Sequence, residues 1–328
     1  MNILAMNVGS SSIKYKLYEN DKFIFGGKLE RVKDFKASVK DIIKQLSEND
    51  IKIDVIGNRI VHAGFVDKNE IINGSVIKKI EKYNELAPLH NIPELEAVKE
   101  LVKLNIKQIA VYDSLFYKDL DKKAYMYALP YKYYKKYGIR KIGFHGISHS
   151  YVSEFIEKKF NKKLKIISCH LGAGCSVTAI KDGKAIDTSM GFTPCEGLIM
   201  GTRCGDIDPV IIPFLIEYEK LNYKEVNEII NDKSGLKGLT GKEDYRDVRN
   251  SKNKMSKLAM KMFEYRIRKY IGAYDAVLNK AEIIAFTGAI GENVESLRKN
   301  VTKGFKAKVL VVKTDEEEAI AKEVGKLL

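Results

Sequence analysis

One local pattern occurs twice in this chain, about half its length apart. Residues 3–8 form an apolar run that meets a short polar turn, and an alternating segment begins at Ile13. The second copy runs from residues 166–169 through a turn at 172–174 into residues 176–180. Alternation predicts half-buried strands, and glycine-rich turns predict hairpins. A strand–turn–strand unit repeated at half the length predicts two similar domains, each presenting a turn toward a shared cleft.

Apolar segments alternate with amphipathic stretches in the rest of the chain. The further segments expected to be strands are residues 23–25, 55–61, 108–112, 184–186, 283–287 and 309–312. One stretch has apolar residues at helical spacing, namely Met260, Phe263, Ile267, Tyr270, Tyr274 and Val277. We expect this stripe in the core or in a subunit interface. Strands that alternate with helices indicate the α/β class.

Length and composition limit the kinds of protein that the chain can be. With 328 residues and 45% hydrophobic content it can bury a large core, so two domains or one large domain are expected. No apolar run approaches the roughly 20 residues that cross a membrane, and no signal peptide is recognised. We therefore expect a cytoplasmic chain. The cysteines lack CxxC spacing and are expected to be thiols: Cys169, Cys175, Cys195 and Cys204.

The chain is basic, with 57 Lys and Arg against 43 Asp and Glu and a net charge of +14. Such a balance allows binding to nucleic acid, because a basic face releases counterions from phosphates. Most of the lysines, however, are scattered through amphipathic stretches such as residues 36–52 and 252–269. This distribution indicates a solvated surface, and no nucleic-acid partner is expected.

The histidines lie in short segments rich in Gly, Pro, Arg or Asn, and they are His62, His90, His145, His149 and His170. Their grouping indicates a site, although each one could also be a structural histidine in a capped turn. A zincin site is excluded because Gly146 stands where that motif carries glutamate. The Walker pattern is absent as well, since Gly241 and Lys242 are followed by Glu243.

Other residue types around glycine turns indicate phosphate chemistry. Arg59 and Arg203 lie beside such turns, and isolated carboxylates occur at Asp113, Asp206, Asp208 and Glu316. Turns of exposed N–H groups with serine hydroxyls and a lysine can cradle phosphate oxygens. Arginines can clamp a carboxylate or a phosphoryl group, and carboxylates can hold magnesium. Together these features suggest phosphoryl transfer.

Several long motifs resemble those of the acetate kinase family, in order and nearly from end to end: residues 7–14, 143–149, 187–194, 200–209 and 286–293. The resemblance implies a duplicated, actin-like and sugar-kinase-like (ribonuclease H-like) α/β fold with two domains around a central cleft. The implied domains are residues 1–116 with 318–328, and residues 117–317, through which the family typically forms homodimers. The implied reaction is reversible phosphoryl transfer from ATP to acetate, giving acetyl phosphate and ADP, with Mg²⁺ or Mn²⁺.

The same resemblance implies roles for matching residues. The catalytic residues would be Arg59, Asp113, His145 and Arg203, with both arginines on the carboxylate and phosphoryl groups and His145 donating a hydrogen bond. The small acyl pocket would be formed by Arg59, Val61, Leu89, His90, Phe144 and Pro194. The phosphate and nucleotide side would comprise Asn7, Ser10, Ser12, Lys14, His170, Gly172, Gly174, Asp244, Arg246, Gly291 and Asn293. Asn7, Asp113 and Glu316 would lie at the metal, with Glu317 able to replace Glu316. A turn-stabilising role stays open for His90, His149 and His170.

The chain also departs from the family's pattern, at Asn58, Tyr117, Ala173 and Ala289. It is shorter than typical members, chiefly between Lys14 and Arg59 and between Asn293 and Glu316. Three alternatives therefore stay open: pyrophosphate as donor, propionate or butyrate as acceptor, or a non-catalytic nucleotide-binding member. We interpret Cys204, beside Arg203, as a small residue in place of serine rather than as a redox switch.

Overall fold

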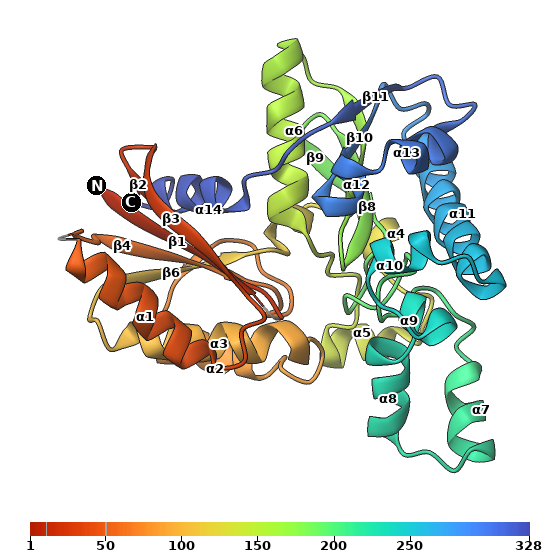
Figure 1. Ribbon diagram of the computed structural model, residues 1–328, viewed down its shortest axis with the longest axis horizontal. Coiled ribbons are helices and arrows are strands. Elements are labelled where there is room, and N and C mark those ends of the chain that lie inside the picture. The colour runs from red at the N-terminus through yellow and green to blue at the C-terminus, as the bar shows by residue number, and fades with distance from the viewer. Residues whose placement is uncertain (11, 50) are drawn as a thin grey trace. The chain divides into compact units, whose positions relative to one another are not determined.

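The chain forms two compact units (Figure 1), and the computed structural model describes residues 1–10, 12–49 and 51–328. Unit 1 comprises Met1–Lys118, His145–Tyr151 and Asp315–Leu328. Unit 2 comprises Asp119–Phe144 and Val152–Thr314. The C-terminal segment therefore belongs to the same unit as the N-terminus.

Unit 1 is built on a mixed sheet with the strand order β3-β2-β1-β4-β6-β5. Its strands are β1 (Asn2–Val8), β2 (Ser12–Glu19), β3 (Lys22–Glu30), β4 (Val55–Ile60), β5 (Glu70–Ile71) and β6 (Lys107–Tyr112). The first three strands pair antiparallel, whereas β4 runs parallel to both β1 and β6. Parallel strands end at the same edge of a sheet, so the residues that follow β1, β4 and β6 lie at one edge.

Helices cover both faces of this sheet, because successive side chains of a strand point to opposite faces. Leu4 and Met6 of β1 are buried with α1 (Phe35–Glu48) and α3 (Pro88–Val102). Ile3 and Ala5 are buried with α14 (Glu316–Gly325) on the other face. The packing of α14 is close, since a Cβ at Gly57 would lie 2.6 Å from a methyl group of Val324. The unit also contains α2 (Gly74–Glu81), the 3₁₀ helix η1 (Leu115–Tyr117) and the start of α6 (Gly146–Phe160).

Unit 2 repeats the same strand arrangement, with the order β11-β10-β7-β8-β9. Its strands are β7 (Lys165–Leu171), β8 (Cys175–Lys181), β9 (Lys184–Thr188), β10 (Ile283–Thr287) and β11 (Lys308–Val311). Three antiparallel strands are again followed by strands that run parallel to the first of them. Both second strands carry a register shift near their far end, at Leu17/Tyr18 and at Ala179/Ile180. The predicted internal repeat is thus confirmed in the topology.

The helices of unit 2 are α4 (Lys122–Tyr125), α5 (Tyr131–Tyr137), α7 (Ile211–Tyr218), α8 (Tyr223–Asp232), α9 (Gly235–Thr240), α10 (Tyr245–Asn250), α11 (Lys254–Val277), α12 (Gly288–Asn293) and α13 (Glu295–Thr302). The predicted stripe on α11 is only partly right. Phe263, Ile267 and Tyr274 are buried, but Val277 is 54% exposed. The buried face continues instead through Ala259 and Ile271, because the helix turns by about 100° per residue and the stripe drifts around it. None of the helices in the described ranges has the length and apolar content needed to cross a membrane.

Candidate active site

Asp113 lies at the centre of a polar cluster at the strand-end edge of unit 1. It directly follows β6 and is 1% exposed. Its Oδ2 atom accepts hydrogen bonds from the Arg59 guanidinium, at 3.1 Å, and from the backbone N–H of His145, at 2.8 Å. Its Oδ1 atom accepts from the N–H of Ile147 at 3.1 Å. Three predicted site residues, Arg59, Asp113 and His145, are therefore brought together.

The glycine after His145 is required by the close approach of two backbone segments. A Cβ at position 146 would lie 2.0 Å from the carbonyl oxygen of Asp113. His145 itself has a φ of 58°, in the left-handed region that few side chains adopt, and α6 begins at the next residue. The N–H groups at this helix start point to the Asp113 carboxylate, which the helix dipole also favours. The histidine is thus positioned by its backbone as well as by its side chain.

Asn7 connects this cluster to the first turn of α14. Its Nδ2 atom donates to Glu316 and to Glu317, both at 2.8 Å, and its Oδ1 atom accepts from Arg59 at 3.2 Å. Burial raises the pKa of Glu317, and Lys14 acts in the opposite direction. The candidate metal residues Asn7, Asp113 and Glu316 are therefore linked, and Glu317 shares the same amide.

The candidate phosphate residues of unit 1 surround the turn between β1 and β2. Gly9 donates its N–H to the carbonyl of Ser12 at 2.8 Å, which closes the turn. Ser10 and Lys14 are exposed there, and Ser12 is partly buried. The turn therefore offers two hydroxyls and an ammonium group to solvent.

Sequence analysis missed Glu94, a buried residue of α3 that is close enough to Arg59 to be affected by its charge. The side chain is 1% exposed, and its Oε2 atom accepts from the backbone N–H of Val61 at 3.0 Å. Burial raises the pKa of Glu94 to about 8, and the charge of Arg59 acts in the opposite direction. The sequence gives no sign that Glu94 is buried next to Val61, because a glutamate in a helix is usually exposed.

The charge of Arg59 reflects its acidic surroundings. Burial by itself would lower the pKa of the Arg59 guanidinium, but the carboxylates of Asp113, Glu316 and Glu94 together raise it. Arg59 is therefore a permanent cation, fixed by hydrogen bonds to Asn7 and Asp113.

The candidate acyl-pocket residues of unit 1 lie on a segment that Asn91 holds in place. Asn91 Oδ1 accepts from the N–H of His62, and its Nδ2 atom donates to the His62 carbonyl at 2.8 Å. His62 is buried and stacks on Tyr83, so it is structural. Val61 is buried and His90 is partly buried. The Leu89 side chain lies outside the described part of the structure, so its predicted place in the pocket stays a prediction.

Arg203 is the arginine of the predicted site that belongs to unit 2. Its guanidinium donates to the carbonyl of Pro194 at 3.3 Å and contacts the Met200 sulfur at 3.7 Å. Burial lowers the pKa of Arg203. Pro194 is buried, as is Phe144, so the unit 2 candidates for the acyl pocket are apolar and desolvated.

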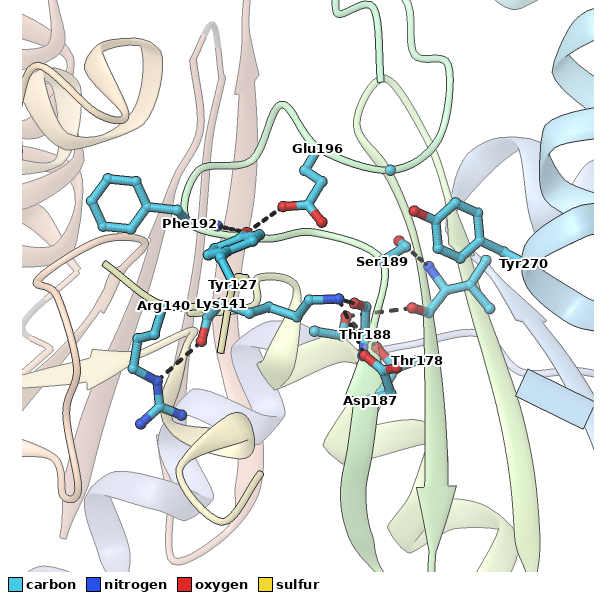
Figure 2. A network of polar contacts seen from close by, with 12 residues as sticks. Tyr127, Arg140, Lys141, Thr178, Asp187, Thr188, Ser189, Phe192, Glu196 and Tyr270 are labelled. Atoms are coloured by element: carbon cyan, nitrogen blue, oxygen red, sulfur yellow. Dashed lines mark hydrogen bonds and ion pairs between the residues drawn. The ribbon is translucent and has the colours of Figure 1, made fainter. Parts of the chain in front are cut away.

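A network of polar contacts holds the segment that precedes Arg203 (Figure 2). The Tyr127 hydroxyl binds Glu196 and accepts from the backbone N–H of Phe192 at 2.8 Å. A Cβ at Gly191 would lie 1.6 Å from the Glu196 carboxylate and 2.1 Å from the Tyr127 hydroxyl, so a larger residue here would displace this pair. Lys141 donates to Asp187 and to the Thr188 carbonyl. These contacts explain the motif at residues 187–194 as a scaffold, which its sequence alone did not reveal.

Asp206 and Asp208 each accept hydrogen bonds that stabilise turns of unit 2. Asp206 accepts from the N–H of Gly197 at 2.8 Å and from the Tyr270 hydroxyl at 2.9 Å, and it pairs with Arg266. Asp208 accepts from the N–H of Val210. Both carboxylates are thus engaged beside the segment that carries Arg203.

Three of the predicted nucleotide residues, His170, Gly172 and Gly174, lie at the turn between β7 and β8. Gly172 donates to the Gly174 carbonyl at 3.0 Å, and the Ala173 carbonyl accepts from Gly201, two residues before Arg203. His170, at the end of β7, is partly buried, and its Nε2 atom would lie 3.7 Å from a Cβ at Gly172. The glycine turn and the Arg203 segment are therefore adjacent.

The remaining nucleotide candidates are tied into helix ends. Asp244 is the N-cap of α10 and forms an ion pair with Arg246 at 2.6 Å, which lowers the pKa of Asp244. Gly291 is buried, and its carbonyl accepts from Arg298. Asn293 donates to the carbonyl of Ala289 at 2.8 Å. Asp244 and Asn293 therefore have structural partners in addition to any ligand.

Comparisons with known proteins agree with this arrangement. The acetokinase family model matches residues 20–327. The chain is 40% identical to an acetate kinase of Halothermothrix orenii over an alignment of 397 positions that covers all of both proteins. It is 37% identical to an acetate kinase of Methanosarcina thermophila, covering all of this chain and 97% of that protein. The chain therefore belongs to the acetokinase family, and it is a phosphotransferase.

Solved structures confirm the fold. An acetate kinase of Porphyromonas gingivalis superposes with a TM-score of 0.88 at 35% identity, covering 99% of each chain. A propionate kinase of Francisella tularensis gives a TM-score of 0.88 at 34% identity, covering 98% of each chain. A putative N-acetylmannosamine kinase of Listeria monocytogenes reaches 0.53 at 12% identity and covers all of both chains, which shows the fold alone. The predicted actin-like, sugar-kinase-like α/β fold is thus confirmed.

Proposed function

We propose that this chain catalyses reversible phosphoryl transfer from ATP to the carboxylate of acetate, giving acetyl phosphate and ADP. The observation that carries the proposal is the cluster in which Asp113 holds both the Arg59 guanidinium and the backbone of His145. A fixed cation and a fixed imidazole suit a reaction whose catalysis depends on positioning and electrostatic stabilisation. Membership of the acetokinase family supports the same reaction.

Each residue type has a defined task in this proposal. Arg59 binds the carboxylate, and Arg203 stabilises the transferring phosphoryl group, because phosphoryl transfer spreads negative charge over the equatorial oxygens. His145 donates a hydrogen bond to that group. Acetate is ionised at neutral pH, so no general base is needed to activate it. The glycine turn at 172–174, residues 291–293 at the end of α12, and the residues Asp244 and Arg246 are proposed to receive the nucleotide. The sequence-based expectation of a turn at 291–293 was wrong, because these residues are helical.

Magnesium is proposed as the resident cation of unit 1. Asn7, Asp113 and Glu316 present oxygen atoms, the ligands that Mg²⁺ prefers, and Mg²⁺ commonly binds one or two carboxylates together with water and substrate phosphate. Within the described ranges, no three His, Cys, Asp or Glu side chains form a complete metal site. Phosphate oxygens and water would complete the shell, and the ion would add positive charge beside the phosphate.

Propionate is proposed as a second, poorer acceptor. The propionate kinase of Francisella tularensis is 34% identical and has the same TM-score as the Porphyromonas acetate kinase, which supports a fold that accommodates both acids. Val61 and Pro194 are buried apolar residues. An apolar pocket discriminates between two acids that differ by one methylene by only about 1–3 kcal/mol, so propionate should be used, but less well than acetate.

The test is a hydroxamate assay with acetate, propionate and butyrate, each with ATP or pyrophosphate and with Mg²⁺ or excess chelator. The proposal expects trapped acyl phosphate with acetate, ATP and Mg²⁺, less with propionate, and none with chelator. Faster turnover with butyrate than with acetate, or with pyrophosphate than with ATP, would contradict the assignment of that substrate. An inactive protein that still binds ATP would favour the non-catalytic alternative.

We further propose that the two units are the two domains of the actin-like fold, and that the protein is a homodimer through unit 2. Two helices of unit 2 expose apolar side chains: Ile211, Phe214, Ile216 and Tyr218 on α7, and Met255, Leu258, Met262 and Tyr265 on α11. Exposed apolar faces of this kind mark interaction sites. Light scattering after size-exclusion chromatography measures the mass in solution, and a monomer at micromolar concentration would contradict the dimer.

A further inference from the structure

Two cysteines lie on either side of the segment that carries Arg203. The Sγ atoms of Cys195 and Cys204 are 3.7 Å apart. A disulfide needs about 2.05 Å between the sulfur atoms, so a shift of less than 2 Å would join them. The carbonyl oxygen of Ile230 contacts both residues. It lies 3.5 Å from Cys195 Sγ and accepts a hydrogen bond from the backbone N–H of Cys204 at 3.0 Å.

The backbone between these cysteines is held in a closed loop. Asp206 donates its N–H to the carbonyl of Gly197 at 3.0 Å, and its side chain accepts from the N–H of the same residue. Gly205 has a φ of 69°, and a Cβ there would lie 2.5 Å from the carbonyls of Gly197 and Leu198. The fold therefore brings the two thiols together without a covalent bond between them.

The electrostatics of the pair favour reaction at Cys195. The contact with the Cys204 sulfur lowers the pKa of Cys195, burial acts in the opposite direction, and the charge of Arg203 lowers the pKa further. The two other cysteines, Cys169 and Cys175, are fully buried in β7 and β8, and burial raises the pKa of Cys175 to about 12. Because the thiolate is the reactive form, oxidation is directed to Cys195.

A bond between these sulfur atoms would act directly on Arg203. The guanidinium donates to the carbonyl of Pro194, the residue before Cys195, and Cys204 is the residue after Arg203. The network of Figure 2 holds the chain at Phe192 and Glu196, on either side of Cys195, so closing the gap between the sulfur atoms also pulls on the Arg203 segment. A misplacement of about 1 Å in a positioned catalytic group can cost roughly a hundredfold in rate.

We propose that Cys195 and Cys204 are a peroxide-sensitive modification site, whose reversible disulfide switches off phosphoryl transfer by displacing Arg203. This proposal revises the interpretation of Cys204 from the sequence as only a small residue in place of serine, because the sequence does not show that Cys195 lies 3.7 Å away. The effect on rate rests on the proposed function of Arg203, whereas the bond itself does not. The Cys195 thiolate attacks hydrogen peroxide, takes one oxygen and, with one proton, gives a sulfenic acid and water. The Cys204 thiol then displaces that hydroxyl group as a second water. In total, two thiols and one peroxide give one disulfide and two waters, with two electrons passing from sulfur to peroxide.

The experiment treats the reduced full-length protein with hydrogen peroxide, blocks the remaining thiols, and measures intact mass, peptide linkage and acetate-dependent turnover. We expect loss of two hydrogen atoms, one peptide pair joined through Cys195 and Cys204, and a fall in kcat of at least tenfold. The KM for ATP should change little. Dithiothreitol should restore both mass and rate.

Matched variants separate this switch from general oxidative damage. Cys204→Ser should be active and resist peroxide, and Cys195→Ala gives the same test should the first variant fold poorly. Cys169→Ala keeps the pair and should respond like the unmodified chain. Absence of the linked peptide, an unchanged kcat after its formation, or equal inactivation of Cys204→Ser would overturn the proposal. A reduced protein without activity on any acid would instead refute the proposed function, while mass still reports the disulfide.

Discussion

At the scale of single residues, the proposed catalytic role of Arg203 can be tested most directly. Its side chain is held by a backbone carbonyl and a methionine sulfur, and the neighbouring Asp206 is engaged by Gly197, Tyr270 and Arg266. Phosphoryl transfer develops negative charge that a fixed guanidinium stabilises, which is the role proposed for Arg203.

We expect Arg203→Ala to lower kcat on the order of 10³-fold, by analogy with catalytic arginines in other phosphotransferases, while the melting temperature changes by only a few degrees. Arg203→Lys should restore little, because a point charge cannot reproduce the planar fork of the guanidinium. Steady-state kinetics and thermal melts of the same preparations check this. A loss of melting temperature in proportion to the loss of activity would show that the arginine is structural.

Glu94 gives a prediction about pH and stability. Its pKa is about 8 in the folded chain, against an ordinary value of 4.5, and burial is the main cause. Between these values the folded state retains a proton that the unfolded state has lost, so stability falls as pH rises, by about 1.4 kcal/mol per pH unit at most. The contribution of Glu94 to the stability of the folded state is therefore most favourable below pH 4.5, and most of it is lost once the pH reaches 8.

Glu94→Gln should remove this slope, because an amide does not titrate. Urea unfolding at pH 5, 6, 7 and 8 should show that the free energy of unfolding of the variant increases relative to that of the unmodified chain as pH rises. Glu96→Gln, on the same helix but only partly buried, is the matched control. Parallel curves for Glu94→Gln and the unmodified chain would contradict the assignment.

At the scale of elements, the start of α6 is fixed by contact between backbone segments rather than by helix propensity. A Cβ at Gly146 has no room beside Asp113, whereas Gly74, at the start of α2, has open space around it. We expect Gly146→Ala to cost roughly 1–3 kcal/mol through overpacking and to lower kcat about a hundredfold by moving His145. Gly74→Ala should leave both quantities nearly unchanged. The explanation fails if the two variants behave alike in melts and in turnover.

The turn between β7 and β8 allows a test of the donor. Ala173 is exposed in this turn, and its side chain cannot donate a hydrogen bond to a phosphate, although the backbone N–H groups remain. A hydrogen bond to a charged group is worth about 1.5–3 kcal/mol, so Ala173→Asn should raise kcat/KM for ATP about tenfold or more. Ala173→Leu adds size without an amide and should give no gain. Equal responses to the two substitutions, with pyrophosphate preferred to ATP, would point to a different donor.

At the scale of the whole molecule, the repeated strand–turn–strand unit could be predicted because hairpins leave a local signal. Five strands follow the same order in both units, with β5 as an extra strand in unit 1. The matching register shifts in β2 and β8 extend the repeat further than the sequence analysis did. Contacts between distant segments leave no such signal. The bond from Asn7 to Glu316 joins opposite ends of the chain, and the burial of Glu94 depends on how α3 packs beside Val61.

The same limit applies to the scaffold around Arg203. Tyr127 and Glu196 are distant in the sequence, and neither residue type indicates a structural role. The approach of Cys195 to Cys204 likewise depends on the closure between Gly197 and Asp206, which a residue pattern does not encode. Residue types could therefore predict the kind of chemistry, and tertiary packing determines which neighbours support it.

The central claim, that this chain phosphorylates acetate reversibly, is tested most directly in the reverse direction. Purified protein is mixed with acetyl phosphate, ADP and Mg²⁺, and ATP is measured by luciferase. The account predicts ATP formation by the unmodified chain, none in excess chelator, and about a thousandfold less with the folded Arg203→Ala variant. No ATP from the unmodified chain, or equal rates with Arg203→Ala, would contradict it.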